Sequence, residues 1–220
     1  MDKKTKSEIE DAMLKLIKAV DDNPYDAQAY YNLGIALNES KAQTQAEELF
    51  KKALSIFKNQ TKETELLEYG LANTYYESSL YNEAIKEFAK IKGALKKDAM
   101  LMIGQSYFAL ESYQKSLVYA ITVLEKDSKN TDAMMLIADS FMALGQLNQA
   151  KEYFLKVIKI QHQNKQALFQ LGVIYVTNYG SDRGYFAKVK AIDSTYYHKM
   201  MQRLSDIESF IMKAKEMEEK

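Results

Sequence analysis

Apolar residues recur along this chain at intervals of three and four, which is the spacing of one face of an α-helix. A clear case lies near the C-terminus, where Met200, Leu204, Ile207, Ile211 and Ala214 form a single stripe. Short segments such as 77–79, 111–112 and 144–146 separate the apolar stretches. The pattern therefore predicts helices joined by short loops, with no strand periodicity between them.

The helical pattern also repeats. From Gly34, offsets of 12, 16 and 19 residues lead to Ala46, Phe50 and Ala53. The same offsets from Ala72, Gly104 and Ala138 reach similar residues, namely Ala84, Phe88 and Ile91; Ser116, Ala120 and Val123; and Ala150, Phe154 and Val157. Successive anchors are 38, 32 and 34 residues apart, and Gly172 follows after 34 more. The chain is therefore an array of units with a period near 34 residues.

Helix packing explains the repeated pattern. A small residue on each of two helices lets their axes approach closely, and large neighbours fill the grooves beside them. The first helices supply Tyr30, Leu33, Tyr75, Tyr107, Phe141 and Tyr175, and the second helices supply Phe50, Phe88 and Phe154. Asn130 or Thr131 is the predicted N-cap of one first helix. Each unit is predicted to be a helical hairpin.

This pattern resembles the tetratricopeptide repeat. The resemblance is carried by the segment 32–34 with Ala46 and Phe50, and by the corresponding small and aromatic residues of the later units, and it covers about residues 8–180. It implies an all-α, right-handed α-solenoid of helix-turn-helix repeats with a C-terminal capping helix. The chain departs from the family pattern because it has no tryptophan and a single proline, Pro24, and because Gly184 and Lys188 stand at the small and aromatic places of the fifth repeat.

The expected organisation is one array with incomplete ends. Ala12, Leu16 and Ala19 reproduce the offsets of a second helix without a first, and Ser7 is its expected N-cap. This helix either caps the array or follows residues upstream, and capping is the preferred interpretation. The expected segments are a half-repeat at 7–24, repeats at 27–60, 65–96, 97–130 and 131–164, a degenerate fifth repeat at 165–193, and a capping helix at 195–219.

Composition narrows the classes of partner. The 30 basic and 30 acidic residues cancel, so no overall positive field favours nucleic acid, and no apolar run is long enough for membrane insertion. The absence of cysteine excludes disulfides and thiolate chemistry. No secretion signal is visible in residues 1–10, so the expected location is cytoplasmic. A periplasmic or membrane-anchored location remains open if a signal precedes the given sequence.

No active site is expected. His162 and His198 are far apart and lack metal-binding spacing. The segment 179–184 holds two glycines beside Arg183 and has two interpretations, an anion-binding nest or simply a loop with Ser181 or Asp182 as N-cap. The loop interpretation is preferred. We therefore expect no catalytic residues, no cofactor and no metal.

The resemblance implies where a partner would bind, because first helices line the concave face of such arrays. The residues that it assigns to a partner-binding groove are Tyr31, Asn38, Tyr69, Asn73, Tyr76, Gln105, Phe108, Met135, Asp139, Met142 and Phe169. The inward-facing positions contain no lysine or arginine, which disfavours the acidic C-terminal tails of heat-shock chaperones as ligands. The groove is aromatic, methionine-bearing and acidic, so a peptide or amphipathic helix with apolar anchors and some basic residues is the expected ligand.

Two functions are compatible with this pattern. The preferred one is a scaffold or adaptor that binds a segment of a partner protein on its concave face. The alternative is a structural subunit of a self-assembled or larger complex, without free-peptide recognition, in which residues 195–219 form a homodimer contact. An enzyme is not expected, because no site for one is visible.

Overall fold

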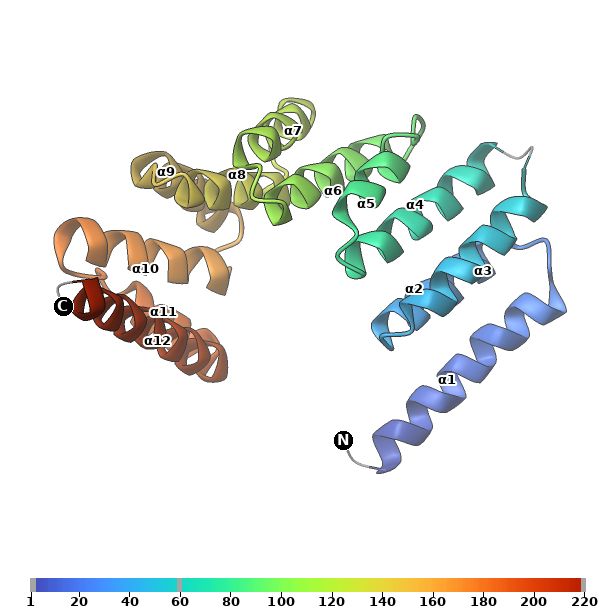
Figure 1. Cartoon of the computed structure of the whole chain (residues 1–220), viewed down its shortest axis with the longest axis horizontal. Coiled ribbons are helices and arrows are strands. Elements are labelled where there is room, and N and C mark those ends of the chain that lie inside the picture. Colours follow the sequence, from blue (N-terminus) through green and yellow to red (C-terminus); the bar gives the residue numbers. More distant parts are fainter. Residues whose placement is uncertain (1–2, 59–60, 219–220) are drawn as a thin grey trace. The chain divides into compact units, whose positions relative to one another are not determined.

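The structure is a computed structural model that describes residues 3–58 and 61–218, with side chains placed over 10–58, 62–207 and 209. Within these residues the chain forms twelve α-helices and no strand (Figure 1), so the all-α prediction is confirmed. The chain divides into two compact units, residues 1–126 and 127–220.

The helices of the first unit are α1 (Lys3–Asp22), α2 (Ala27–Glu39), α3 (Gln43–Ile56), α4 (Thr61–Glu77), α5 (Tyr81–Phe88), α6 (Lys96–Ala109) and α7 (Tyr113–Lys126). Those of the second unit are α8 (Thr131–Ala143), α9 (Leu147–Ile160), α10 (Lys165–Tyr179), α11 (Tyr185–Ile192) and α12 (Ser194–Glu218). Helices α2–α3, α4–α5, α6–α7, α8–α9 and α10–α11 pack as successive hairpins. Three hairpins lie within the ranges 27–60, 131–164 and 165–193, whereas α4 begins at Thr61 and α6 at Lys96, before the ranges 65–96 and 97–130.

Side-chain caps and left-handed turns define the hairpins. Asn130, one of the two predicted N-caps of α8, accepts a hydrogen bond from the Ala133 amide at 2.8 Å. Asp26 and Asn164 cap α2 and α10 in the same way. The first four hairpins turn at corresponding residues with positive φ, which are Lys41, Ser79, Glu111 and Gly145. In each turn three consecutive backbone amides donate to carbonyls of the preceding helix, which satisfies its C-terminal end.

The core of the first unit is built around Phe50. Its ring is fully buried and lies against Gly34 of its own hairpin and Gly70 of the next. A Cβ atom at either glycine would lie 2.2–2.3 Å from a ring carbon of Phe50, so neither position has room for a side chain. Ala46 and Ala53 are fully buried beside the ring. The small-residue and aromatic positions of the repeat therefore meet as the spacing predicted.

The later repeats bury the predicted residues in the same way. None of these side chains is more than 3% exposed: Ala72, Ala84, Phe88, Ile91, Ser116, Ala120, Val123, Ala138, Ala150, Phe154 and Val157. The fifth hairpin differs in register. The ring beside Gly172 belongs to Phe186, and Lys188 is exposed. The assignment of Lys188 to the aromatic place was wrong, because α11 begins at Tyr185 and places Phe186 against α10 two residues earlier than the family offset requires.

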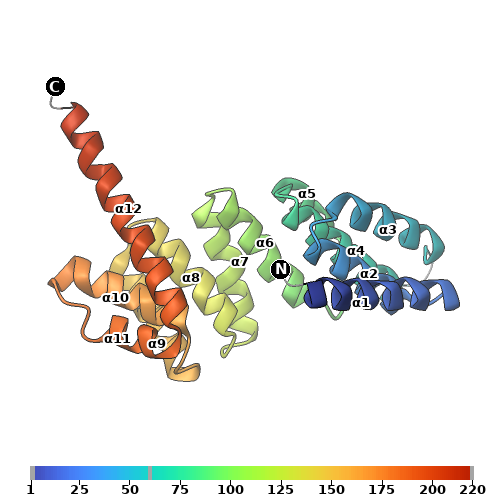
Figure 2. The same cartoon turned by 90° about the horizontal axis from the view of Figure 1, so that it is seen from below.

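Helix α12 covers one end of the second unit with its first half. Tyr196, Tyr197, Met200 and Leu204 pack against a core that contains Leu168, Phe169 and Val189. Beyond Leu204 the helix extends past α10 and α11 (Figure 2), and Ile207 is 55% exposed. The side chains of Ile211 and Ala214, which complete the predicted stripe, lie outside the described residues.

Helix α1 packs against α2 along one face (Figure 1). Val20 contacts the core of the first unit, and Leu16 is half-buried. Ala12 and Ala19, the predicted small positions, are exposed. This exposure is what a second helix without its first helix would show. The helix already begins at Lys3, so the prediction of Ser7 as N-cap was wrong.

Candidate functional site

A hollow lies between the C-terminal ends of α2 and α4 in the first unit. Its volume is about 380 Å³, and it is lined by Ile35, Asn38, Glu39, Lys41, Asn73 and Glu77. Helices α2 and α4 pack directly against each other, which brings together lining residues 32 or more positions apart in sequence. Two of the predicted groove residues, Asn38 and Asn73, therefore share one site.

Asn38 lines this hollow with a buried side chain that forms one side-chain hydrogen bond. Its side chain is 5% exposed, and its Nδ2 donates a hydrogen bond to the Thr74 hydroxyl at 3.0 Å. The Thr74 hydroxyl in turn donates to the Gly70 carbonyl at 3.0 Å, so it can only accept from Asn38. This orientation leaves the Asn38 carbonyl oxygen, Oδ1, buried without a hydrogen-bond partner among the described residues. An unsatisfied buried acceptor costs about 1–3 kcal/mol.

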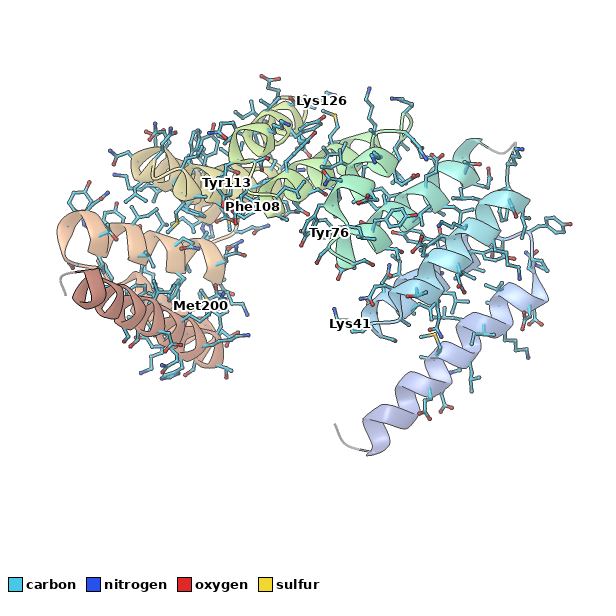
Figure 3. All side chains as sticks on the ribbon, viewed as in Figure 1. Lys41, Tyr76, Phe108, Tyr113, Lys126 and Met200 are labelled. Atoms are coloured by element: carbon cyan, nitrogen blue, oxygen red, sulfur yellow. The ribbon has the colours of Figure 1, made fainter. Side chains whose placement is uncertain are left out.

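Aromatic side chains of α2, α4 and α6 lean against the second helix of their own hairpin. Tyr69 meets Phe88 edge-on with ring centroids 5.4 Å apart, and Tyr76 meets Tyr81 at the same distance. Phe108 and Tyr113 pair at 5.2 Å (labelled in Figure 3), and Tyr31 lies 6.4 Å from Phe50. All four first-helix rings are partly buried, so each has one supported side and some surface left for a partner.

Burial also affects the chemistry of Tyr69. Desolvation raises the pKa of its hydroxyl to about 12, although a hydrogen bond with the Asn73 amide acts in the opposite direction. Asn73 thus links the Tyr69 ring to the hollow that contains Asn38. Gln105 and Phe108 lie on α6, which packs against α5 and α7, and they do not line this hollow.

In the second unit, Met135, Asp139 and Met142 lie on α8, all partly buried. Their spacing of four and three places them on one face of the helix. The Asp139 carboxylate has no ion pair among the described residues, and burial raises its pKa from 3.8 to about 6. The Tyr196 hydroxyl of α12 is close enough for the two groups to interact electrostatically. An apolar helix face with one desolvated carboxylate is suited to a cationic partner group.

The structure overturns one of the predicted groove residues. Phe169 is 1% exposed, because its ring is enclosed by Phe186 at 5.2 Å and Tyr196 at 6.2 Å. Helix α12 covers this position, and the amphipathic pattern of residues 195–219 predicts a cap on the last repeat without showing which side chains it buries. Phe169 is therefore a core residue and is not available to a partner.

The prediction of a groove without basic residues missed Lys41. This residue stands in the α2–α3 turn with φ 63° and lines the hollow (Figure 3), where its Nζ lies 3.9 Å from a Glu77 carboxylate oxygen. Thr74, which orients Asn38, was also missed. Its position beside Asn73 was visible in the sequence, but its contact spans 36 residues and depends on how α2 and α4 pack.

The two histidines are engaged by their own helical segments. A ring nitrogen of His162 lies 2.8 Å from the Ile158 carbonyl, and one of His198 lies 2.7 Å from the Ser194 carbonyl. No group of three or more potential metal ligands occurs in the part of the chain that the structure describes. None of the helices searched in that part is long and apolar enough to cross a membrane.

The segment 179–184 does not form an open anion nest. The Asp182 carboxylate itself accepts a hydrogen bond from the Phe186 amide at 2.8 Å at the start of α11. This agrees with the loop interpretation, but the N-cap of α11 is Gly184, so the prediction of Ser181 or Asp182 as N-cap was wrong. An external anion would have to displace a carboxylate that the chain supplies.

Comparison with known proteins agrees with this architecture. Residues 6–61 and 131–164 match two models described as tetratricopeptide repeat. No curated protein matches the sequence. Among solved structures, PilW, a type IV pilus biogenesis factor, aligns with a TM-score of 0.73 and 19% identity, covering 91% of this chain and 92% of its own.

Two further structures show the same fold. The pilF protein of Pseudomonas aeruginosa aligns with a TM-score of 0.68 and 16% identity over 90% of this chain and 91% of its own. YrrB, described as a tetratricopeptide protein with an unusual peptide-binding site, aligns with a TM-score of 0.58 and 23% identity over 86% of this chain and 97% of its own. The predicted α-solenoid class is confirmed by these matches.

Proposed function

We propose that this chain, which matches tetratricopeptide-repeat models over residues 6–61 and 131–164, binds an extended segment of a partner protein in the hollow between α2 and α4. The partner segment carries apolar anchors and at least one basic residue. Its apolar side chains contact the exposed surfaces of Tyr31, Tyr69 and Tyr76, and its positive charge lies beside Glu39 and Glu77.

The observation that carries this proposal is the unpartnered oxygen of Asn38. A buried acceptor that the chain leaves unsatisfied is satisfied when a bound backbone or side-chain N–H donates to it. Asn38 lines the hollow, and its buried oxygen can accept from a ligand once the side chain turns toward the opening. Asn73 and the two carboxylates supply further polar contacts around the same opening.

The face of α8 that bears Met135, Asp139 and Met142 is proposed as a second contact surface of the same chemical character. Methionine side chains adapt to varied apolar partners, and a cation beside Asp139 would favour its ionised form. Binding of a cationic segment there should release a proton near pH 6, where the free carboxyl is half protonated. Calorimetry in two buffers of different ionisation enthalpy would measure that proton.

Peptide selection tests the hollow directly. We expect peptides selected from a random library on the whole chain to be rich in basic and apolar residues. Replacing Asn73 with alanine or Glu77 with glutamine should weaken their binding about tenfold, because both side chains line the hollow and neither belongs to the buried core. Fluorescence anisotropy with a selected peptide measures the change.

Two controls keep that experiment interpretable. Glu48→Gln removes an exposed carboxylate from α3, outside the hollow, and should leave binding unchanged. The double variant Tyr69→Ala/Tyr76→Ala should abolish binding, but it also removes ring contacts with Phe88 and Tyr81, so its circular dichroism must show intact helices. Selected peptides that bind the Asn73 and Glu77 variants as tightly as the wild type would refute this site.

A self-assembling structural subunit is the second candidate, favoured by Ile207 of α12, whose side chain is 55% exposed. Removal of residues 195–220 would uncover the Phe169 core, so the informative truncation deletes only 206–220. Light scattering distinguishes the two candidates. Equal monomer masses for the full and shortened chains would exclude a dimer through this segment, whereas a dimer that dissociates on truncation would establish one.

A further inference from the structure

Three tyrosines form a continuous ring cluster where α9, α10 and α11 meet. The Tyr175 ring stacks on the Tyr185 ring with centroids 5.5 Å apart and an interplanar angle of 21°. Tyr179, one helical turn after Tyr175, lies 5.5 Å from it and is 54% exposed. The cluster therefore connects the partly buried rings of Tyr175 and Tyr185 to the exposed ring of Tyr179.

Three cations lie on this cluster. The Arg183 guanidinium carbon is 4.7 Å from the Tyr175 centroid and 5.4 Å from the Tyr179 centroid. The Lys151 Nζ is within 6 Å of the same two centroids and 3.5 Å from the Tyr179 hydroxyl oxygen. Lys188 Nζ lies 5.3 Å from the Tyr185 centroid. We call these six residues the tyrosine–cation patch.

In the part of the chain that the structure describes, no carboxylate is paired with a cation of the patch. Asp182, which precedes Arg183, is engaged with the Phe186 amide. Lys151 and Arg183 each lie within 6 Å of the Tyr175 and Tyr179 centroids, so both positive charges are near the same two rings. An anion placed between the two cations would be attracted by both.

The backbone holds Arg183 over the rings. Helix α10 ends at Gly180 in the left-handed conformation, with φ 70°, and Arg183 itself has φ 52°. A left-handed conformation costs about 1 kcal/mol for a residue with a Cβ atom. Stacking on two tyrosines offsets this cost and fixes the planar guanidinium, so its N–H groups are available in a defined orientation.

We propose that the tyrosine–cation patch binds an acidic segment of a partner protein, with aspartate or glutamate carboxylates between Lys151 and Arg183. A pre-oriented guanidinium matches a carboxylate in two-point geometry, and exposed tyrosine and arginine dominate the energetics of protein interfaces. The ligand proposed for this patch is acidic, whereas the ligand proposed for the hollow between α2 and α4 is basic. The proposal therefore does not depend on the function proposed above.

A protein partner fits the patch better than nucleic acid. Affinity for a polyphosphate backbone depends on many cations along a track, and the patch supplies three on a chain with 30 basic and 30 acidic residues. A short acidic segment needs only two or three charge contacts. Nucleic acid is nevertheless included as a competitor in the test.

The test uses the fact that the chain has only two arginines, Arg183 and Arg203. Their side-chain Nε–H groups give two resolvable NMR signals, and Arg183→Lys assigns them. On titration of the whole chain with hexaglutamate peptide at low salt, the Arg183 signal should shift and the Arg203 signal should not. Lys151→Gln should weaken peptide binding about tenfold, and 0.15 M salt should weaken it further.

Lys156→Gln is the matched control, because Lys156 lies on the same helix as Lys151 and its Nζ is 4.2 Å from the Tyr153 centroid, outside the patch. This variant should bind hexaglutamate like the wild type. Equal weakening by Lys156→Gln, an equal shift of both arginine signals, or no shift at millimolar peptide would overturn the proposal. Displacement of the peptide by an equal concentration of hexathymidylate would replace it with a nucleic-acid site.

Discussion

Replacing Phe50 with alanine should lower the free energy of unfolding by about 3–5 kcal/mol, the loss typical of truncating a large buried ring. The ring is fully buried and fills the space between α2 and α4, so its removal leaves a cavity shared by two hairpins. Urea unfolding followed by circular dichroism measures the change. Asn32→Ala, on the exposed side of α2, is the control and should change stability by less than about 0.5 kcal/mol.

The two glycines against Phe50 allow a sharper version of this experiment. Alanine normally stabilises a helix relative to glycine by about 0.5–1 kcal/mol. At Gly34 the sign should reverse, with a loss of about 1–3 kcal/mol from overpacking, because the new Cβ would overlap the ring. Phe50→Leu should recover part of that loss. Strict additivity of Gly34→Ala and Phe50→Leu would show that the ring is not what excludes a side chain at Gly34.

Replacing Asp139 with asparagine should stabilise the second unit, and the gain should depend on pH. The folded carboxyl has a pKa of about 6 and the unfolded one about 3.8, so the folded state binds the proton more tightly. Stability contributed by this group is therefore present below pH 3.8 and is lost as pH rises to 6. The asparagine variant should be more stable by about 3 kcal/mol at pH 7.5 and about 1 kcal/mol at pH 4.5.

Urea unfolding at the two pH values checks this prediction, with Glu152→Gln as a control that removes an exposed carboxylate from α9. The control should show little change at either pH. A gain for Asp139→Asn that is equal at pH 4.5 and 7.5 would mean that the carboxyl is not desolvated in the folded chain. The variant also tests function. If Asp139→Asn raises stability and weakens peptide binding, Asp139 lowers the stability of the chain but contributes to a binding site.

Asp139 and Asp132 differ in solvent exposure, and the sequence pattern does not predict this difference. Both are acidic residues that the repeat register assigns to the inner side of α8, so the register predicts the same environment for both. In the structure Asp132 is exposed in the first turn, whereas Asp139 is desolvated and has Tyr196 of α12 nearby. The register predicts a helix face, but the dielectric environment depends on which neighbouring elements cover that face.

Contacts between elements also decide the environments of Asn38, Phe169 and Arg183. The first was predicted as a groove residue, but only its contact with Thr74, 36 residues away, reveals the unsatisfied oxygen. The second has the same repeat position as Tyr31 and Tyr69 and is buried because α12 packs over it. Arg183 belongs to the segment 179–184, for which an anion-binding nest was one of two interpretations. The left-handed turn instead places its guanidinium on two tyrosine rings.

The sequence by itself determined the helical hairpins, their period and the residues of their cores. These follow from local rules, since helix periodicity and the need for a small residue opposite a large one act within about 34 residues. The tertiary structure alone decided that Phe50 is shared by Gly34 and Gly70, that α12 covers Phe169, and which polar groups are left without partners. The physical reason is that desolvation and hydrogen-bond satisfaction depend on contacts between hairpins, which no single repeat contains.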